Sequence, residues 1–259
     1  MKRIILLAIL KNNSKRAIIK ARKVVKVLEL FIRGVRIDWE SVDPCSYLHK
    51  IESIKSFSEL SFTNPITFFV GENGSGKSTL LEAIAVAFGF NSEGGTINYH
   101  FRTYDDVSVL SESVTLIKGF KRPKIGYFFR AETFFNVATV GMVEYMGKDY
   151  HSQSHGESFL SFIQGFNKPG LYIIDEPEAA LSPQRQLVLL KHIYSSAKNG
   201  SQFIIATHSP ILLGAPDASI LSFDNGTIEP CRYEDTLSYQ VTKAFLNRKE
   251  LVLQELLND

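Results

Sequence analysis

The sequence has very little cysteine and no long apolar run, and each absence excludes a class of protein. Only Cys45 and Cys231 are cysteine among 259 residues, which excludes a secreted scaffold held by several disulfides and predicts a reducing compartment, the cytoplasm. The apolar run at 4–10 follows two cations, as in a short signal peptide. It is far too short to cross a bilayer, and no small-residue cleavage site follows it.

Repeats and low-complexity tracts are also missing, so fibrous and broadly disordered proteins are excluded. With 44% hydrophobic residues, the chain can bury one large core, as a single domain or as a domain with an inserted lobe. Short apolar runs alternate with helical periods, which is typical of an α/β domain.

Positive charge is concentrated at one end of the chain. Residues 1–36 hold eleven Lys and Arg against one acid and so carry +10, and because the whole chain carries +2, residues 37–259 carry −8. We separate 1–26 as a basic arm. Two explanations fit this arm equally well. It is either a solvated leader or the product of a misassigned start codon, or else an arm that binds nucleic acid or an anionic membrane surface.

Residues 27–259 are predicted to form the main domain. Residues 27–37 resemble a first strand, and three continuous apolar runs predict central strands buried on both faces: ITFFV at 66–70, LYIID at 171–175 and FIIAT at 203–207. Helices are predicted from Ser78 to a stop at Gly89, and after Ser182 as a cap followed by Pro183.

Two further segments are assigned by pattern. Residues 91–165 contain turn signals, the alternating strand-like stretch VSVLSESVTLIKGF and a polar run rich in His and Ser. We interpret this segment as an inserted lobe, because strands of the main sheet flank it on both sides in the sequence. Residues 236–257 predict one or two amphipathic helices packed on the core, and they are a candidate surface for docking a partner.

The stretch GENGSGKST at 71–79 follows a predicted strand and opens a predicted helix, the context that a phosphate-binding loop requires. Its glycines let successive N–H groups point at phosphate oxygens, helped by the positive end of the helix. Lys77 is predicted to bridge the β- and γ-phosphates of ATP, and the Ser78 hydroxyl to ligate Mg²⁺. The predicted nucleotide contacts are Glu72, Asn73, Gly74, Ser75, Gly76, Lys77, Ser78 and Thr79.

Polar residues also end the other two predicted central strands. Asp175 is the predicted Mg²⁺ ligand, and Glu176, its neighbour, is the predicted general base. His208 follows the third strand, where it could hydrogen-bond the γ-phosphate or orient the attacking water. We therefore assign catalysis to Lys77, Glu176 and His208.

QSHGE at 153–157 lies eighteen residues before Asp175 and keeps the serine and second glycine of the pattern LSGGQ. In this order the motifs resemble those of the ABC-type ATPases, over about residues 27–215. The resemblance implies a P-loop α/β fold, with a mostly parallel central sheet, an antiparallel β portion and an inserted helical lobe. It also implies a head-to-tail homodimer that forms on ATP, in which Ser154 and Gly156 meet the γ-phosphate bound by the partner.

Two departures from the family pattern stand out. Arg130 falls where transport members carry a glutamine that contacts Mg²⁺ and water, and a guanidinium cannot ligate a cation. It is predicted to contact phosphate instead, with Glu132 or a water completing the metal shell. Ser182 replaces the usual aspartate, and with the wording THSP it resembles the non-transporter branch of RecF-like repair ATPases and overcoming-lysogeny nucleases.

Three functions therefore stay open. The first is an ATPase switch that drives a separate effector protein in DNA repair or defence. The second is the nucleotide-binding subunit of a membrane transporter with a separate permease, and the third is an ATP-binding scaffold without hydrolysis. Tyr47 either stacks on adenine or lies in the core. A hydrolase triad from Ser154, His155 and Glu157 is disfavoured because no nucleophile elbow is present. A zinc site at His151 and His155 lacks further ligands.

Overall fold

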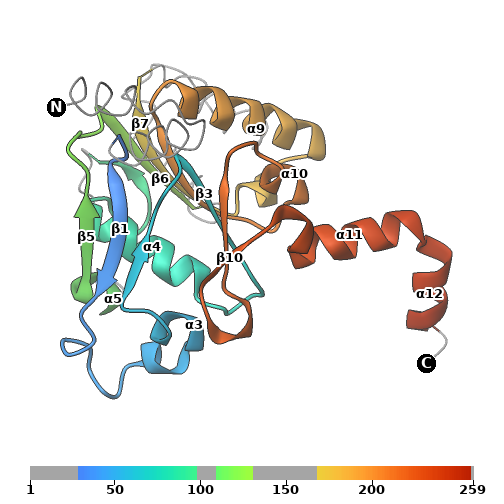
Figure 1. Cartoon of the computed structure of the whole chain (residues 1–259), viewed down its shortest axis with the longest axis horizontal. Helices are drawn as coiled ribbons and strands as arrows, with labels where there is room; N and C mark the ends of the chain where they lie inside the picture. The colour runs from blue at the N-terminus through green and yellow to red at the C-terminus, as the bar shows by residue number, and fades with distance from the viewer. Residues whose placement is uncertain (1–28, 98–108, 131–167, 258–259) are drawn as a thin grey trace, which may run out of the picture.

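The computed structural model describes residues 29–97, 109–130 and 168–257. In this part of the chain, a mixed central sheet of seven strands lies beside a smaller antiparallel sheet of three (Figure 1). The predicted α/β fold, mostly parallel with an antiparallel portion, is confirmed. The order of the central sheet is β10 (Glu229–Cys231), β9 (Ser219–Ser222), β3 (Ile66–Val70), β8 (Gln202–Ala206), β7 (Gly170–Asp175), β6 (Ile125–Arg130) and β4 (Gly95–Thr96).

Strands β9, β3, β8, β7 and β6 pair in parallel, and the strands at the two ends, β10 and β4, pair antiparallel with their neighbours. Every residue of β3, β7 and β8 is buried. Side chains alternate between two cores: Phe69 and Ile204 point into one, while Phe68 and Ile205 point into the other. Two-sided burial explains why these strands are continuous apolar runs, as predicted.

Helices fill both faces of the central sheet (Figure 1). The helix α4 (Lys77–Phe88) packs into the first core and ends at Gly89, whose φ of 114° requires glycine. The helix α9 (Pro183–Lys198) packs into the second core, with Ser182 accepting a hydrogen bond from the Arg185 N–H. Both predicted helices, their caps included, are confirmed.

The smaller sheet has the order β2 (Glu59–Ser61), β1 (Ile32–Ile37) and β5 (Val114–Lys118). It shares the first core with α4. Gln202 joins the two sheets, because its amide accepts hydrogen bonds from the N–H groups of Phe31 and Ile32 and donates one to the Ile32 carbonyl, at 2.7–2.9 Å. Strand β1 begins at Ile32, so the predicted strand at 27–37 was too long.

The short helices connect these elements. They are η1 (Tyr47–Lys50), α3 (Glu52–Lys55), α5 (Val109–Ser113), η3 (Pro177–Ala180), α10 (Pro210–Leu213), η4 (Asp224–Gly226) and η5 (Tyr233–Asp235). The helix α5 shows that the strand-like interpretation was wrong at Val109–Ser113, whereas its continuation at Val114–Lys118 is strand β5. Leu110, Ser111 and Ser113 are buried, and so short a pattern fits one helical turn as well as it fits the alternation seen in the sequence.

The segment predicted as an inserted lobe, 91–165, contributes to both sheets in its described part. Strand β5 belongs to the small sheet, and β6 lies inside the central sheet between β7 and β4. The antiparallel pairing of β4 with β6 closes one edge. The basic arm at 1–26 lies outside the described residues.

The two C-terminal helices, α11 (Leu237–Asn247) and α12 (Lys249–Leu257), extend away from the body (Figure 1). Neither has a buried residue, so the prediction that they pack on the core was wrong. Leu237, Val241 and Phe245 share one stripe of α11 yet are 50, 59 and 38% exposed. Amphipathic spacing reveals an apolar face but not what covers it. A role in docking a partner stays a prediction. None of the helices in the described residues has the length and apolar content to span a bilayer.

Candidate nucleotide-binding and catalytic site

Of the eight residues predicted to contact nucleotide, five lie in the loop between β3 and α4, and Lys77, Ser78 and Thr79 form the first turn of α4. Gly71, Gly74 and Gly76 have φ angles of 142, 81 and 95°, and these let the chain turn tightly into the helix. At Gly76 the space is closed as well, since a Cβ there would lie 2.7 Å from Ile51 and 2.9 Å from Ile54. The loop therefore needs glycine at this position for both its backbone angle and its packing.

Lys77 lies under this loop and is only 4% exposed. Its ammonium donates to the carbonyls of Gly71 at 2.6 Å and Glu72 at 2.7 Å. Burial lowers the pKa of Lys77, and the charges of Glu176 and Asp175 act against that shift. The cation is thus held at the loop, with carboxylates close enough to favour its charged form.

Asp175 ends β7 and is 8% exposed. The Ser78 hydroxyl donates to its Oδ1 at 3.1 Å, so the two predicted Mg²⁺ ligands lie side by side although 97 residues separate them. Burial raises the pKa of Asp175 to about 6, while the Ser78 hydrogen bond and the charge of Arg130 lower it. Two adjacent hard oxygen donors fit Mg²⁺, which usually takes few protein ligands and completes its shell with phosphate and water.

Replacing Asp175 with asparagine tests this buried charge. The raised pKa means that ionisation costs the folded state up to about 3 kcal/mol above pH 6, because each pKa unit corresponds to about 1.4 kcal/mol. This free-energy cost is absent when the pH is below the ordinary pKa of 3.8, and it grows until the pH has risen through about 6. We expect Asp175→Asn, free of nucleotide and metal, to unfold at higher urea than the parent at pH 8. We expect roughly half of that gain at pH 5. A difference that does not change with pH would contradict this assignment.

Glu176 and His208 lie next to one another although their strands are far apart in the sequence. His208 Nε2 is 3.8 Å from Glu176 Oε1 and has no hydrogen-bond partner among the described residues. Glu176 adopts a left-handed backbone with φ of 48°, and its N–H donates to the Ala206 carbonyl at 2.9 Å. Non-glycine residues rarely adopt this conformation, and where they do it is often at a functional site.

Arg130 ends β6 and is the register partner of Asp175 on β7. Its Nη1 donates to Glu82 Oε2 on α4 at 2.9 Å and to the Ser92 carbonyl at 3.4 Å. The guanidinium thus lies beside the predicted metal ligand, bonded to a carboxylate. Its predicted contact with phosphate stays a prediction.

Two carboxylates that bond residues of this site were not predicted from the sequence. Asp224 accepts a hydrogen bond from the Glu72 N–H of the phosphate loop at 3.2 Å and one from Ser222 Oγ at 2.7 Å. No sequence signal could have found it, because it reaches the loop across more than 150 residues. Glu178 accepts a hydrogen bond from the backbone N–H of His208. Its one signal was a further acid three residues after Asp175.

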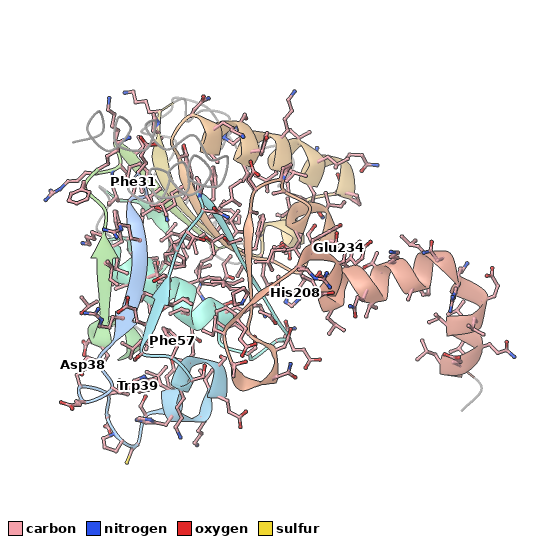
Figure 2. All side chains as sticks on the ribbon, viewed as in Figure 1. Phe31, Asp38, Trp39, Phe57, His208 and Glu234 are labelled. Atoms are coloured by element: carbon pink, nitrogen blue, oxygen red, sulfur yellow. The ribbon has the colours of Figure 1, made fainter. Side chains whose placement is uncertain are left out.

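A hollow of about 550 Å³ opens beside the loop. It is lined by Gly71, Asn73 and His208, and also by Leu237 and Val241 of α11. His208, labelled in Figure 2, therefore lies close to the first turn of α11. Phosphate loop, carboxylates and histidine all meet at the carboxyl ends of parallel strands, the edge where ligands bind in open α/β sheets.

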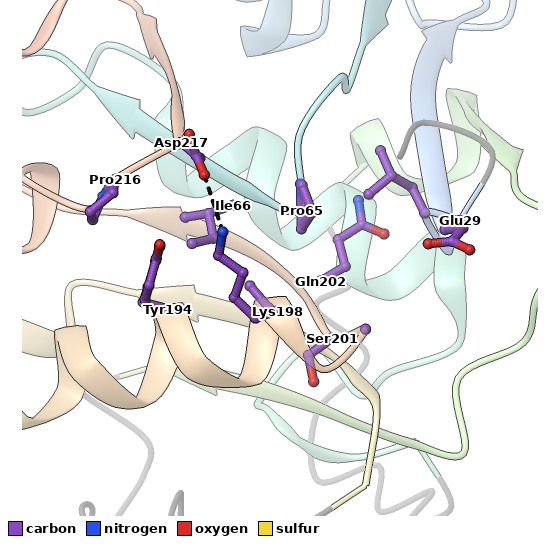
Figure 3. Close-up of a pocket in the computed structure, with 12 residues that line it drawn as sticks. Glu29, Pro65, Ile66, Tyr194, Lys198, Ser201, Gln202, Pro216 and Asp217 are labelled. Carbon is purple, nitrogen blue, oxygen red and sulfur yellow. Dashed lines mark hydrogen bonds and ion pairs between the residues drawn. The ribbon is translucent and has the colours of Figure 1, made fainter. Parts of the chain in front are cut away.

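A second pocket, of about 160 Å³, lies at the opposite ends of the strands (Figure 3). It is lined by Pro65 and Ile66 at the start of β3, by Gln202 at the start of β8, and by Lys198, which pairs with Asp217 at 3.4 Å. This position separates it from the phosphate loop.

Tyr47 is 49% exposed, so the alternative that placed it in the core was wrong, and stacking on adenine stays a prediction. Residues that follow it pack beneath the phosphate loop, where the Ser53 hydroxyl donates to the Ser75 carbonyl. The other predicted site residues, Ser154, Gly156 and Glu132, lie outside the described residues, as do His151 and His155.

Comparisons with known proteins agree with this geometry. One family model, described as "AAA domain", matches residues 48–128, and another, "AAA ATPase domain", matches 159–213. The hemin import ATP-binding protein HmuV of Bartonella henselae is 27% identical over 199 residues, covering 65% of this chain and 74% of that protein. The energy-coupling factor transporter ATP-binding protein EcfA1 of Methanospirillum hungatei is 25% identical, covering 73% of this chain and 76% of that protein.

Solved structures give a coarser likeness. The SMC head domain from Thermotoga maritima aligns with a TM-score of 0.41 at 13% identity, covering 78% of this chain and 99% of that one. An ATP-binding cassette of an ABC transporter in its ADP conformation aligns with a TM-score of 0.36 at 18% identity, covering 75% and 89%.

Proposed function

We propose that this chain is an ATPase of the P-loop, ABC type that binds ATP with Mg²⁺ and hydrolyses it to ADP and phosphate. The matches to two ATPase family models and to ATP-binding relatives support the proposal. One observation carries the proposal. Lys77, the Ser78–Asp175 pair and the Glu176–His208 pair converge at one edge of the central sheet, where β3, β7 and β8 end. In this proposal, Lys77 is the cation that binds phosphate, Ser78 and Asp175 are the pair that would hold the metal, and Glu176 is the base beside the His208 ring.

Each group has a distinct task in this proposal. Lys77 transfers its hydrogen bonds from the loop carbonyls to the β- and γ-phosphates. Ser78 and Asp175 hold Mg²⁺, which supplies charge neutralisation on the phosphate oxygens. Glu176 accepts a proton from the attacking water, and His208 hydrogen-bonds the γ-phosphate or orients that water.

Arg130 takes an electrostatic role in this scheme. Its guanidinium is bonded to Glu82, and its charge opposes the rise that burial causes in the pKa of Asp175. This position favours the ionised carboxylate that a metal ligand requires. To contact phosphate, as the sequence analysis predicted, its side chain would have to leave Glu82.

The assembly is part of the same proposal. Two copies join head to tail on ATP, and Ser154 and Gly156 of one copy close over the triphosphate held by the other. Closing and opening gate a separate effector protein in DNA repair or defence. The sequence motifs DEPEAALSP and THSP, which resemble the non-transporter branch, support this role. The basic arm at 1–26 is the proposed contact with nucleic acid.

A transporter role is the second candidate, and the curated relatives favour it. HmuV and EcfA1 are both named as ATP-binding proteins of import or transport systems. In that case the partner is a membrane permease. Copurification with a membrane protein would decide for the permease, and copurification with a nuclease or another DNA-processing protein for the first candidate.

Phosphate release from ATP is the direct test of hydrolysis. We expect the purified protein to release phosphate with Mg²⁺ and to stop when EDTA removes the metal. Without Mg²⁺, Ser78 and Asp175 supply no positive charge to neutralise the phosphates. A rate equal to that of a Glu176→Gln preparation would instead indicate the third possibility, a scaffold that binds ATP without hydrolysing it.

A further inference from the structure

We infer that Glu178 is a positioning residue for His208, an inference that rests on the proposed ATPase function. Glu178 lies in η3, two residues after the proposed base. Its two carboxylate oxygens are both used on the loop that follows β8. Oε2 accepts from Thr207 Oγ1 at 2.7 Å, and Oε1 accepts from the His208 N–H at 2.5 Å. The Glu178 side chain thus joins the segment after β7 to the loop after β8 that carries His208, and we call this pair of hydrogen bonds the clamp.

The clamp matters because His208 has few other constraints. Its Nε2 makes no hydrogen bond among the described residues, and its nearest charged neighbour there is Glu176, at 3.8 Å. The position of the ring therefore depends on its backbone, which Glu178 holds by the N–H. A neutral acceptor would hold that N–H less strongly, because hydrogen bonds to a charged carboxylate are shorter and stronger.

The rest of the loop also has bonds that do not involve Glu178. The Thr207 N–H donates to the Phe69 carbonyl on β3 at 3.2 Å, and Ser209 Oγ donates to Gln186 Oε1 on α9 at 2.5 Å. These bonds keep the loop in place when Glu178 is replaced. Loss of the carboxylate should then shift the His208 backbone locally rather than unfold the strand end.

Glutamine and alanine at position 178 test the clamp to different degrees. Glutamine keeps one acceptor oxygen, while alanine keeps none. A shift of about 1 Å at a catalytic group can cost roughly 100-fold in rate. We expect Glu178→Ala to lower kcat for ATP hydrolysis about 10- to 100-fold, with Glu178→Gln in between. The affinity for a fluorescent ATP analogue should change less than about threefold, since the carboxylate of Glu178 bonds Thr207 and His208 and not the phosphate loop. Glu229→Gln, at an exposed position on β10, is the matched control.

A double-mutant cycle with His208→Ala separates positioning from a merely structural role. If Glu178 acts through His208, the double variant loses no more kcat than His208→Ala alone. Additive losses, or a fall in ATP affinity by the same factor as kcat, would overturn the inference. If Glu178→Ala does not fold, the same cycle is run with Glu178→Gln.

Amide hydrogen exchange tests the clamp separately from the proposed ATPase function. Exchange at His208 should be faster in Glu178→Ala than in the parent protein, whether or not the protein hydrolyses ATP. An inactive parent protein would contradict the proposed function, and exchange alone would then decide for or against the clamp. An active parent with unchanged kcat in Glu178→Ala would overturn the clamp alone.

Discussion

Replacing Glu176 with glutamine should lower kcat for ATP hydrolysis by roughly 10²- to 10⁴-fold, the usual contribution of a positioned general base. The amide has nearly the shape of the carboxylate but cannot accept a proton from water. Glu176 is 3.8 Å from His208 Nε2 and lies directly after the buried Asp175, so the substitution removes the proposed base from the centre of the site.

ATP binding should survive this substitution, because Lys77 and the loop amides stay unchanged. The ATP-bound form should therefore accumulate, and light scattering should report a dimer of Glu176→Gln only when nucleotide is present. Glu229→Gln is the control for loss of a carboxylate elsewhere. A monomer at all ATP concentrations would contradict the head-to-tail assembly, and full activity of Glu176→Gln would contradict the role of the base.

Replacing Lys77 with alanine should weaken ATP binding by roughly 100-fold or more. Hydrogen bonds from a charged donor contribute about 1.5–3 kcal/mol each, and the ammonium makes two with the loop carbonyls, at 2.6 and 2.7 Å. We expect both to pass to phosphate oxygens in the complex. Alanine leaves neither donor, so the loss appears in binding as well as in rate.

Titration with a fluorescent ATP analogue measures this loss directly. Lys198→Ala is the matched control, because Lys198 ends α9 and pairs with Asp217 near the opposite end of the sheet. Since Lys77 also bonds the loop carbonyls of Gly71 and Glu72, urea unfolding without nucleotide should accompany the titration. Equal affinity of Lys77→Ala and Lys198→Ala would contradict the assignment of the phosphate site.

Prediction from the sequence worked best where residues act locally or where burial leaves a strong pattern. The runs at 66–70 and 203–207 predict strands because both faces are buried. The prediction was wrong at Val109–Ser113, where a short pattern fits both a helix and a strand. It was also wrong along α11, where the described residues do not bury the apolar stripe.

The sequence by itself determined the phosphate loop, since its glycine angles, the helix that follows and the lysine all lie within a few consecutive residues. Only the tertiary structure decided which distant groups complete the site: Asp224 on the Glu72 N–H, Glu82 on Arg130, and Glu178 on the His208 N–H. Such contacts depend on the order and register of the strands. A parallel sheet brings the ends of strands together across long stretches of sequence, and no local pattern encodes which side chains then meet.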